Sequence, residues 1–370
     1  MANSTLPGPS GAQHHQRRHR HRAHTADVPA KPLAPAKTPG AQGYNDQADP
    51  NRTTLLGWTP NLTGVRDWAD HTLQEVEHLW HKALGSIGIE KETGAPVAHG
   101  TAPVATPAGQ LSLDETHALT LRITTVFEGS GGKSMDYVAL AGNFDGMATS
   151  FGLVQWNFGM GTLERLLKKF QAADQAAFDG CFPADANLDT LKAALTAHKI
   201  DDQKKWANDL NKTPAGAKAW TKAFDNLGAV DTFKKIQVDD AINWYNPVVE
   251  KDIKFLRTLA PALMAKVEFR SYAALFDCAI QQGGLKKADD AIKAKVASDK
   301  PATQFALLTI AVTERANAAS HASVADCLSR RLSILNGKRM SFTAYGKTYN
   351  RANSQYGLIQ TEGSKTITGI

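Results

Sequence analysis

Residues 124–167 read TTVFEGSGGKSMDYVALAGNFDGMATSFGLVQWNFGMGTLERLL, and the order of structural signals in this segment indicates the fold class. Just upstream, Ser112 and Glu115 have the spacing of a capping box, and apolar residues recur at helical spacing as far as Phe127. Three glycines in four positions follow, at 129–132, and predict that the helix ends at Glu128. A carboxylate is therefore expected at a helix end.

The residues after this turn favour a short β-region. The segment from Tyr137 is rich in β-branched, aromatic and glycine residues, and 142–146 reads GNFDG, a turn sequence that predicts a small hairpin. From Leu163 to Phe170, apolar residues again recur at helical spacing. Helix, carboxylate, β-region and helix together form a unit that can build a cleft.

Two carboxylates flank this unit, Glu128 before it and Asp145 within its turn. Cleavage of a glycosidic bond uses one protonated carboxylic acid and a second, ionised carboxylate. Apolar neighbours such as Phe127 and Trp156 favour a neutral acid at Glu128, whereas a polar turn favours an ionised Asp145. Surface and turn roles remain open on the spacing alone, because both residue types are common in such positions.

The stretch resembles the active-site region of lysozyme-superfamily glycoside hydrolases, in particular the chitosanase-like branch. Glu128, the glycine-rich turn, the GNFDG segment and the run TSFGLVQ at 149–155 carry the resemblance, which covers about fifty residues. It implies a general acid at Glu128 and a general base or electrostatic stabiliser at Asp145. It also implies a group of substrate-binding residues, with a hydroxyl beside the attacking water, at Thr149, Ser150, Gln155 and Asn157.

The rest of the chain predicts helices almost exclusively. Apolar residues recur every three or four positions in segments separated by Pro, Gly, Asn or Asp. These segments are 188–198, 203–210, 215–227, 230–245, 247–265, 268–282, 286–297, 303–319 and 323–335. The expected fold is mainly α (α+β): a lysozyme-like, two-lobed helical domain with a small β-region beside the active-site cleft, closed by a hairpin between 336 and 358.

Asp277 lies in the middle of an apolar helix face, where an ionised carboxylate needs a cationic partner. Arg315, Arg330 and Arg331 follow as candidates. The family resemblance implies that Asp277, Arg315 and Arg330 form a buried network that braces the catalytic carboxylates. Ion pairs on helix surfaces are the plain alternative.

The chain of 370 residues, 42% of them hydrophobic, can form a substantial core, but its first part differs in composition. We expect a disordered basic arm at 1–52, because Arg and His are clustered there and large apolar side chains are scarce. An amphipathic helical segment at 53–92, a Pro/Ala/Gly/Thr linker at 93–111, the catalytic domain at 112–362 and a tail at 363–370 complete the expected organisation.

Other chemistries find little support in the sequence. The three cysteines, Cys181, Cys278 and Cys327, include no Cys-x-x-Cys pair and have no His at zinc-ligand spacing, so we expect buried reduced thiols, no metal and no cofactor. The basic arm is expected to be a solvated tail without a specific ligand; binding of a polyanion through charge alone is the alternative, and a nucleic-acid partner is not favoured for the chain as a whole. No run of residues has the length and composition of a signal peptide or a membrane span.

The resulting hypothesis is a muramidase-type peptidoglycan hydrolase. The net charge of +6 favours an anionic wall polymer over cationic chitosan. A chitosanase and a non-catalytic wall-binding module remain as alternatives. Without a signal peptide, the protein is expected to be made in the bacterial cytoplasm and to act in the periplasm or wall of a target cell. Delivery by a type VI-like machine, with a cognate immunity protein, is favoured over release during phage-type lysis.

Overall fold

The computed structural model describes residues 109–129, 132–143 and 146–370. All of them belong to one unit of the chain, Gly40–Ile370. The basic arm, the amphipathic segment and nearly all of the linker lie outside the described residues. None of the helices described between 109 and 370 is both long and apolar enough to cross a membrane.

The predicted first helix is α2, Leu113–Glu128, and both of its ends are as expected. The hydroxyl of Ser112 accepts a hydrogen bond from the backbone N–H of Glu115 at 3.2 Å, and the Glu115 carboxylate accepts one from the N–H of Ser112 at 2.8 Å. This reciprocal pair satisfies two N–H groups that a helix start otherwise leaves free. At the other end, the N–H of Gly129 closes the last turn on the carbonyl of Thr125.

The β-region is a three-stranded antiparallel sheet of very short strands. They pair in the order β2 (Leu140–Ala141), β3 (Ser150–Phe151) and β4 (Trp156–Asn157). Phe151 anchors the sheet in the core, since its fully buried ring lies 4.8 Å from that of Phe224 and 6.2 Å from that of Phe233.

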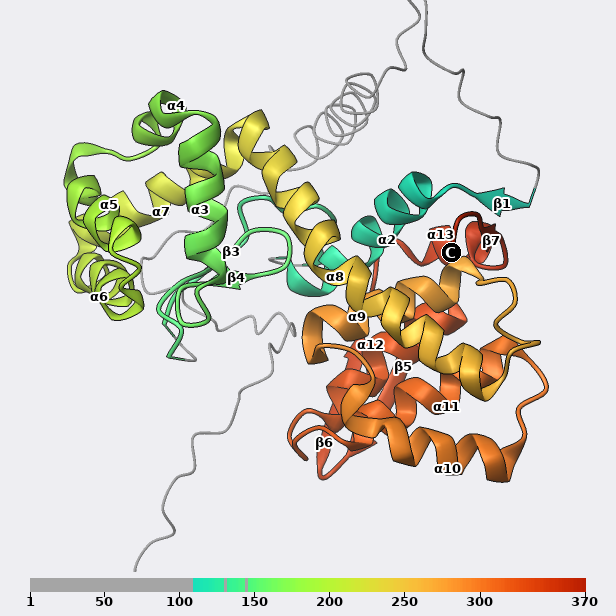
Figure 1. Ribbon diagram of the computed structural model, residues 1–370. Coiled ribbons are helices and arrows are strands. Elements are labelled where there is room, and N and C mark those ends of the chain that lie inside the picture. Colours follow the sequence, from blue (N-terminus) through green and yellow to red (C-terminus); the bar gives the residue numbers. More distant parts are fainter. Residues whose placement is uncertain (1–108, 130–131, 144–145) are drawn as a thin grey trace, which may run out of the picture. The chain divides into compact units, whose positions relative to one another are not determined.

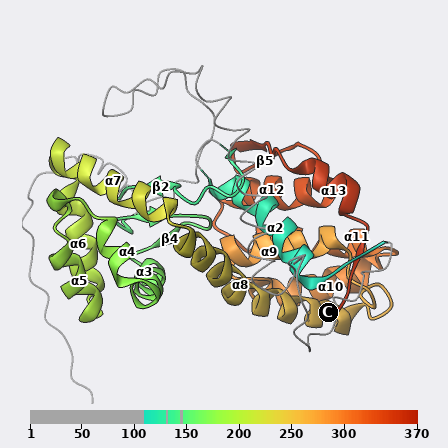
Figure 2. The same ribbon diagram turned by 90° about the horizontal axis from the view of Figure 1, so that it is seen from above.

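A first group of helices follows the sheet and packs around an aromatic core (Figures 1 and 2). Its elements are α3 (Thr162–Ala173), α4 (Gln175–Gly180), η2 (Ala184–Ala186), α5 (Leu188–Thr196), α6 (Ile200–Leu210) and α7 (Pro214–Ala229). Phe170 and Phe178 are fully buried between them, and Trp206 is nearly so. The helical spacing in the sequence predicted α3, α5, α6 and α7 to within a few residues, but it did not predict α4 or η2.

Helix α8, Asp231–Leu259, runs past both helical groups, as both ribbon views show (Figures 1 and 2). The sequence predicted two helices here, 230–245 and 247–265, because proline removes a backbone donor. Instead, Pro247 lies inside one continuous helix. The apolar face continues through it, with Ala241 before and Val249 after the proline both fully buried, and this packing outweighs the local preference.

The second helical group contains the remaining elements. They are α9 (Phe269–Gln282), η3 (Lys286–Ala288), α10 (Asp289–Asp299), α11 (Gln304–Asn317), α12 (Val324–Asn336), the hairpin β5 (Met340–Ala344) and β6 (Lys347–Arg351), and α13 (Tyr356–Glu362). The expected closing hairpin is therefore present. A mainly helical fold with one small β-region beside α2 is confirmed for the described part of the chain.

One pairing extends the domain beyond its expected boundaries at 112 and 362. Strand β1, Gln110–Leu111, pairs in parallel with β7, Thr366–Ile367. The end of the expected linker and part of the expected tail therefore belong to the folded domain.

Candidate functional site

Glu128 is the last residue of α2, and the turn after it is closely packed. A Cβ on Gly129 would lie 2.5 Å from the carbonyl oxygen of Lys133, so no side chain fits where the chain reverses. The returning segment is tied to α2, because the hydroxyl of Thr125 accepts a hydrogen bond from the N–H of Met135 at 2.9 Å. These contacts fix the position of Glu128 at the helix end.

A network of opposite charges holds the Glu128 side chain. Its Oε1 atom lies 2.5 Å from Nη2 of Arg330, and the same Nη2 lies 2.7 Å from Oδ1 of Asp277. Oδ2 of Asp277 lies 3.5 Å from Nε of Arg331. Two carboxylates thus face two guanidinium groups, which balances the charges in a largely dry environment.

Burial falls from one end of this network to the other. Side-chain exposure is 0% for Asp277 and Arg331, 4% for Arg330 and 16% for Glu128. Burial opposes the charged form of Arg330, but the carboxylates of Asp277 and Glu128 hold its pKa well above the ordinary value. The guanidinium also lies over the ring of Phe127, 4.9 Å from its centroid. Glu128 is therefore the member of the network that a ligand can reach.

The network keeps Arg330 paired even if Glu128 changes partner. Nε and Nη2 of Arg330 both donate to Oδ1 of Asp277, at 3.2 and 2.7 Å. If Glu128 takes up a proton or turns toward a ligand, the buried guanidinium still has the Asp277 carboxylate. Arg330 therefore does not depend on Glu128 alone for a partner of opposite charge.

One residue that was expected in the network, Arg315, is not part of it. Arg315 was expected to pair with Asp277, but its guanidinium donates to the carbonyls of Gln282 and Gly284, both at 2.7 Å, after the end of α9. Arg331 takes that place beside Asp277. Arg331 was among the candidate partners in the sequence, as the neighbour of Arg330 in α12.

Thr149 and Ser150 lie at the start of β3, and their side chains differ in burial and in hydrogen bonding. Thr149 is fully buried, and its hydroxyl accepts a hydrogen bond from Nε1 of Trp220 at 3.2 Å. In this conformation it therefore supports the core rather than a substrate. Ser150 is 4% exposed and remains the candidate hydroxyl for positioning water.

Gln155 and Asn157 use their side chains within the β-region. The amide of Gln155, a residue with φ of 55°, donates to the carbonyls of Ala139 and Gly152, both at 3.2 Å. The side-chain oxygen of Asn157 accepts from the N–H of Met160 at 2.8 Å, ahead of α3. Both are half-buried and shape the loops, and substrate contact by either remains a prediction.

Asp145, the expected second catalytic carboxylate, lies outside the described residues. Its neighbour Asn143 is described, and its side-chain oxygen accepts a hydrogen bond from the N–H of Ala148 at 2.9 Å across the turn. The role of Asp145 remains a prediction.

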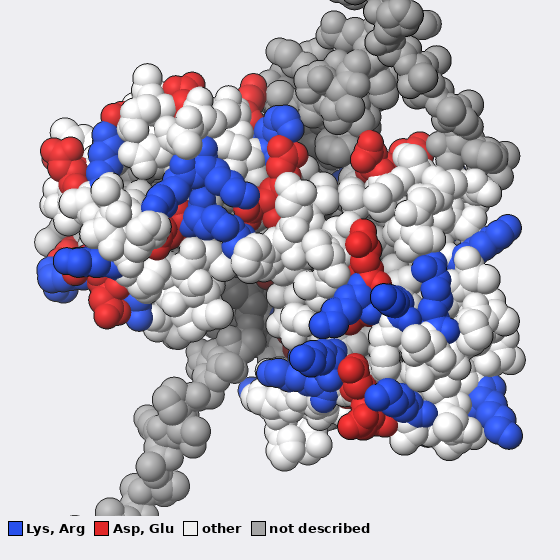
Figure 3. All heavy atoms as spheres, in the orientation of Figure 1, with Lys and Arg blue, Asp and Glu red and all other residues white. Residues whose placement is uncertain are grey.

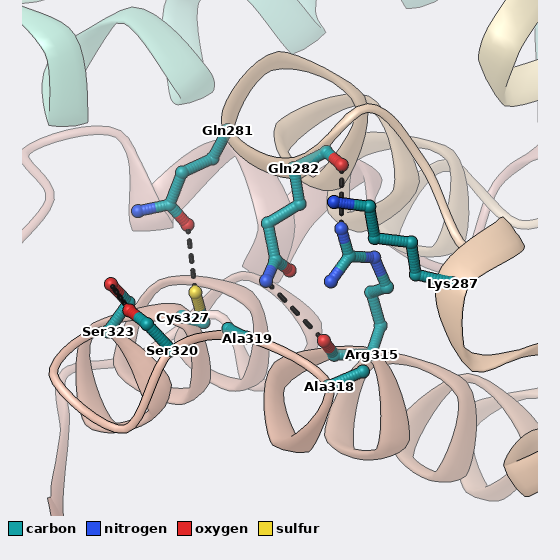
Figure 4. A pocket seen from close by; sticks show the side chains of 9 residues that line it. All are labelled: Gln281, Gln282, Lys287, Arg315, Ala318, Ala319, Ser320, Ser323 and Cys327. Atoms are coloured by element: carbon teal, nitrogen blue, oxygen red, sulfur yellow. Dashed lines mark hydrogen bonds between the residues drawn. The ribbon is translucent and has the colours of Figure 1, made fainter.

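A hollow of about 330 Å³ lies at α9, α11 and α12 (Figure 4). Gln281 connects it to the charged network, because its Oε1 accepts from Nη2 of Arg331 at 2.7 Å and from the thiol of Cys327 at 3.3 Å. Arg315 and Lys287 line it, and among the described residues no carboxylate does. It therefore lacks the acid and base that glycosidic cleavage requires.

The cysteines and the possible metal ligands give no sign of a disulfide or a metal site in the described part of the chain. Cys181, Cys278 and Cys327 are all buried and free, as predicted. Among the residues that the structure describes, no three His, Cys, Asp or Glu side chains are grouped so that they could hold a metal ion.

Comparison with known proteins gives only distant likenesses. The sequence matches no protein-family model and no curated protein sequence. Among solved structures, native chitosanase from Bacillus subtilis MY002 is similar, with 13% identity, a TM-score of 0.41, and coverage of 64% of this chain and 97% of that one. A chitosanase complex has 17% identity and a TM-score of 0.36, and covers 65% of this chain and 97% of its own. Chitosanase OU01 with substrate has 16% identity and a TM-score of 0.39, with the same two coverages. Likenesses this weak do not establish a family or an activity.

Proposed function

We propose that the chain is a glycoside hydrolase that cleaves β-1,4 bonds in an amino-sugar polymer, with Glu128 as the general acid. The observation that carries the proposal is the setting of Glu128. It is a partly exposed carboxylate at a helix end, paired with Arg330, which is paired in turn with the fully buried Asp277. The resemblance to chitosanase-like enzymes implies an Asp–Arg–Arg network behind the catalytic acid, with Arg315 as its second arginine. In the structure Arg331 lies beside Asp277 instead.

The proposed reaction assigns each proton. Protonated Glu128 gives its proton to the glycosidic oxygen while the bond from that oxygen to the anomeric carbon breaks. Water then attacks the anomeric carbon, and Asp145 accepts its proton or stabilises the positive charge. Carboxyl groups about 6.5–9.5 Å apart would give inversion, and about 5 Å would give retention.

Peptidoglycan is the proposed substrate and chitosan the alternative. The chain has 42 basic and 36 acidic residues and a pI of about 9.0, and such a protein is attracted to an anionic wall polymer and repelled by a cationic one. A fold retained only for wall binding is the second alternative. Wall binding requires no catalytic acid. Substitution of Glu128 should therefore abolish cleavage by an enzyme but leave the binding of a wall-binding module unchanged.

We further propose that the protein is an antibacterial effector that acts in the wall of a target cell. The support is the basic arm and the Pro-rich linker ahead of the domain, which suit a loading segment. Export of the chain to the periplasm of a susceptible host should stop growth, while cytoplasmic expression should not. Equal growth in both cases would contradict this proposal. An immunity protein would restore growth in the first case.

The experiment for the enzyme is digestion of purified peptidoglycan, with chitosan in parallel, followed by mass spectrometry of the soluble fragments. We expect disaccharide-peptides with new reducing ends from peptidoglycan and little release from chitosan. Both Glu128→Gln and Asp145→Asn should lose this activity. Cleavage of chitosan alone would keep the enzyme class and overturn the substrate, and binding without any cleavage would replace the enzyme by a wall-binding module.

A further inference from the structure

A second cluster of charges surrounds Asp240 on α8. Its carboxylate accepts hydrogen bonds from Arg165, with Nη2 at 2.6 Å, and from Nζ of Lys169 at 2.6 Å. Nε1 of Trp156 donates to the same carboxylate at 3.0 Å. Arg165 and Lys169 are one turn apart on α3, so three elements, α3, α8 and β4, meet at this carboxylate.

The cluster presents positive charge to the solvent. The Asp240 side chain is only 2% exposed, whereas Arg165 is 26% and Lys169 47% exposed. Burial alone would raise the pKa of Asp240, but the hydrogen bonds from Arg165 and Lys169 lower it below the ordinary value, so the carboxylate is ionised at neutral pH. The two cations, Arg165 and Lys169, therefore share one buried anion, Asp240. Figure 3 shows Lys and Arg side chains gathered over the α3 part of the surface.

An exposed aromatic ring adjoins these cations. Trp244 of α8 is 52% exposed, and the guanidinium carbon of Arg165 lies 3.7 Å from the centroid of its ring. The stack holds both side chains in place and leaves about half of the Trp244 surface open to the solvent. An aromatic ring beside a cation fits a sugar that carries a carboxylate, because the ring packs on C–H groups and the cation binds the acid.

Helix α8 connects the cluster to the network around Glu128. Tyr245, the residue after Trp244, is half-buried, and its ring centroid lies 6.0 Å from that of Phe276 on α9. Phe276 precedes Asp277, which pairs with Arg330 of the network. The cluster and the network therefore lie on two helices, α8 and α9, that pack against each other.

We propose that Arg165, Lys169 and Trp244 form a subsite for a carboxylate-bearing unit of the substrate chain, a sugar together with the acidic group attached to it. The subsite selects an anionic amino-sugar polymer over the same polymer without its charge. This inference rests on the proposed function and specifies its substrate class.

The test compares native peptidoglycan sacculi with sacculi whose carboxylates have been converted to methylamides. Binding is measured by co-sedimentation in the Glu128→Gln background, and cleavage is measured separately with Glu128 intact. The full chain is used throughout, so that the basic arm contributes equally to every variant. Lys169→Gln and Trp244→Ala remove the two exposed contacts. Lys235→Gln, which removes a 55% exposed lysine paired with Asp239 on α8, and Tyr345→Ala, at a 63% exposed ring, are the matched controls.

We expect Lys169→Gln to weaken binding to native sacculi about tenfold, the equivalent of one charge-assisted hydrogen bond, and to leave binding to amidated sacculi unchanged. Trp244→Ala should weaken binding to both, and the controls to neither. In the active enzyme, Lys169→Gln should raise KM on native sacculi with little change in kcat.

Equal binding of both kinds of sacculi by the parent chain would overturn the inference, as would an equal effect of Lys169→Gln and Lys235→Gln. Preferential binding of an acidic protein instead of sacculi would also overturn it. The proposed function fails separately, if the chain with Glu128 intact cuts neither polymer. The binding comparison still decides the subsite in that case.

Discussion

Asp277 is the residue on which the site depends most for stability. Its side chain has no exposed surface and faces both Arg330 and Arg331. Asp277→Asn keeps the shape but leaves Arg330 with Glu128 alone and Arg331 without an ion-pair partner among the described residues. We expect a loss of about 3–5 kcal/mol in the free energy of unfolding, because breaking a buried ion pair leaves uncompensated charge. Urea denaturation measures it.

Asp231→Asn is the matched control for that change. Asp231 is 66% exposed and pairs with Lys234 on the surface of α8. Such surface pairs contribute little to stability, so this variant should unfold at the same urea concentration as the wild type. If Asp277→Asn were also as stable as the wild type, the network would not brace the site.

Asp252 should make stability depend on pH. Burial raises its pKa from 3.8 to about 7, although its carboxylate accepts a hydrogen bond from the N–H of Leu285 at 3.0 Å. Between these two values the folded state binds a proton that the unfolded state has released. Stability from this group is therefore present at low pH and lost as pH rises to about 7, by up to about 1.4 kcal/mol per pH unit.

Asp252→Asn keeps an acceptor for Leu285 and removes this titration. The stability of the variant minus that of the wild type should be larger at pH 8 than at pH 5, as measured by thermal unfolding of both proteins at both values. A stability difference between variant and wild type that did not change with pH would show that Asp252 is ionised in the fold at both.

At the residue scale, the sequence identified the reactive candidate but not all of its partners. Glu128 could be predicted, because the glycines after it end a helix by a local rule. The partners of Asp277 could not be ranked, since which of three arginines reaches it depends on how α9, α11 and α12 pack.

At the scale of elements, the contact between the β-region and α8 depends on Gly152. This residue has φ of 77°, and a Cβ on it would lie 2.3 Å from Oε1 of Gln237. That oxygen accepts from the N–H of Leu153 at 3.1 Å, while the Gln237 amide donates to the carbonyl of Tyr137, also at 3.1 Å. Gly152→Ala should therefore cost about 2 kcal/mol or more in stability and reduce activity by shifting the β-region.

Gly142→Ala provides the control in the same β-region. Among the described residues, no heavy atom lies within 4 Å of the Cβ it would add, and Gly142 does not have a positive φ. We expect its unfolding temperature to match that of the wild type. Equal effects of the two substitutions would indicate that the close approach to Gln237 does not matter.

The elements also show where local patterns fail. The capping box of α2 and most helices could be predicted from periodicity, because those signals lie within a few residues. The continuity of α8 through Pro247 could not, because it depends on an apolar face that packs against helices distant in the sequence.

For the whole molecule, β1 and β7 join the two ends of the described chain. The N–H of Thr368 donates to the carbonyl of Leu111 at 2.9 Å, and the N–H of Ile367 donates to that of Val267 at 2.9 Å. Deletion of 364–370 removes these bonds, and also the acceptor for the N–H of Phe269 at the start of α9. We expect the unfolding temperature to fall by about 4 °C or more.

The substitution Thr361→Ala, at an exposed position in α13, is the control for the deletion and should have no effect. An unchanged unfolding temperature in the truncated chain would show that the β1–β7 pairing is dispensable. Two-residue strands so far apart have no local sequence signal, so the sequence assigned them to a linker and a tail.

The central claim is that Glu128 is the catalytic acid, and the most direct measurement is the rate of reducing-end release from purified peptidoglycan by the wild type and Glu128→Gln. Glu362→Gln, which alters another partly exposed carboxylate, serves as the control. We predict that Glu128→Gln unfolds at a temperature close to that of the wild type and is at least about 100-fold slower, while Glu362→Gln retains the wild-type rate. A folded Glu128→Gln variant that releases reducing ends at the wild-type rate would contradict the account.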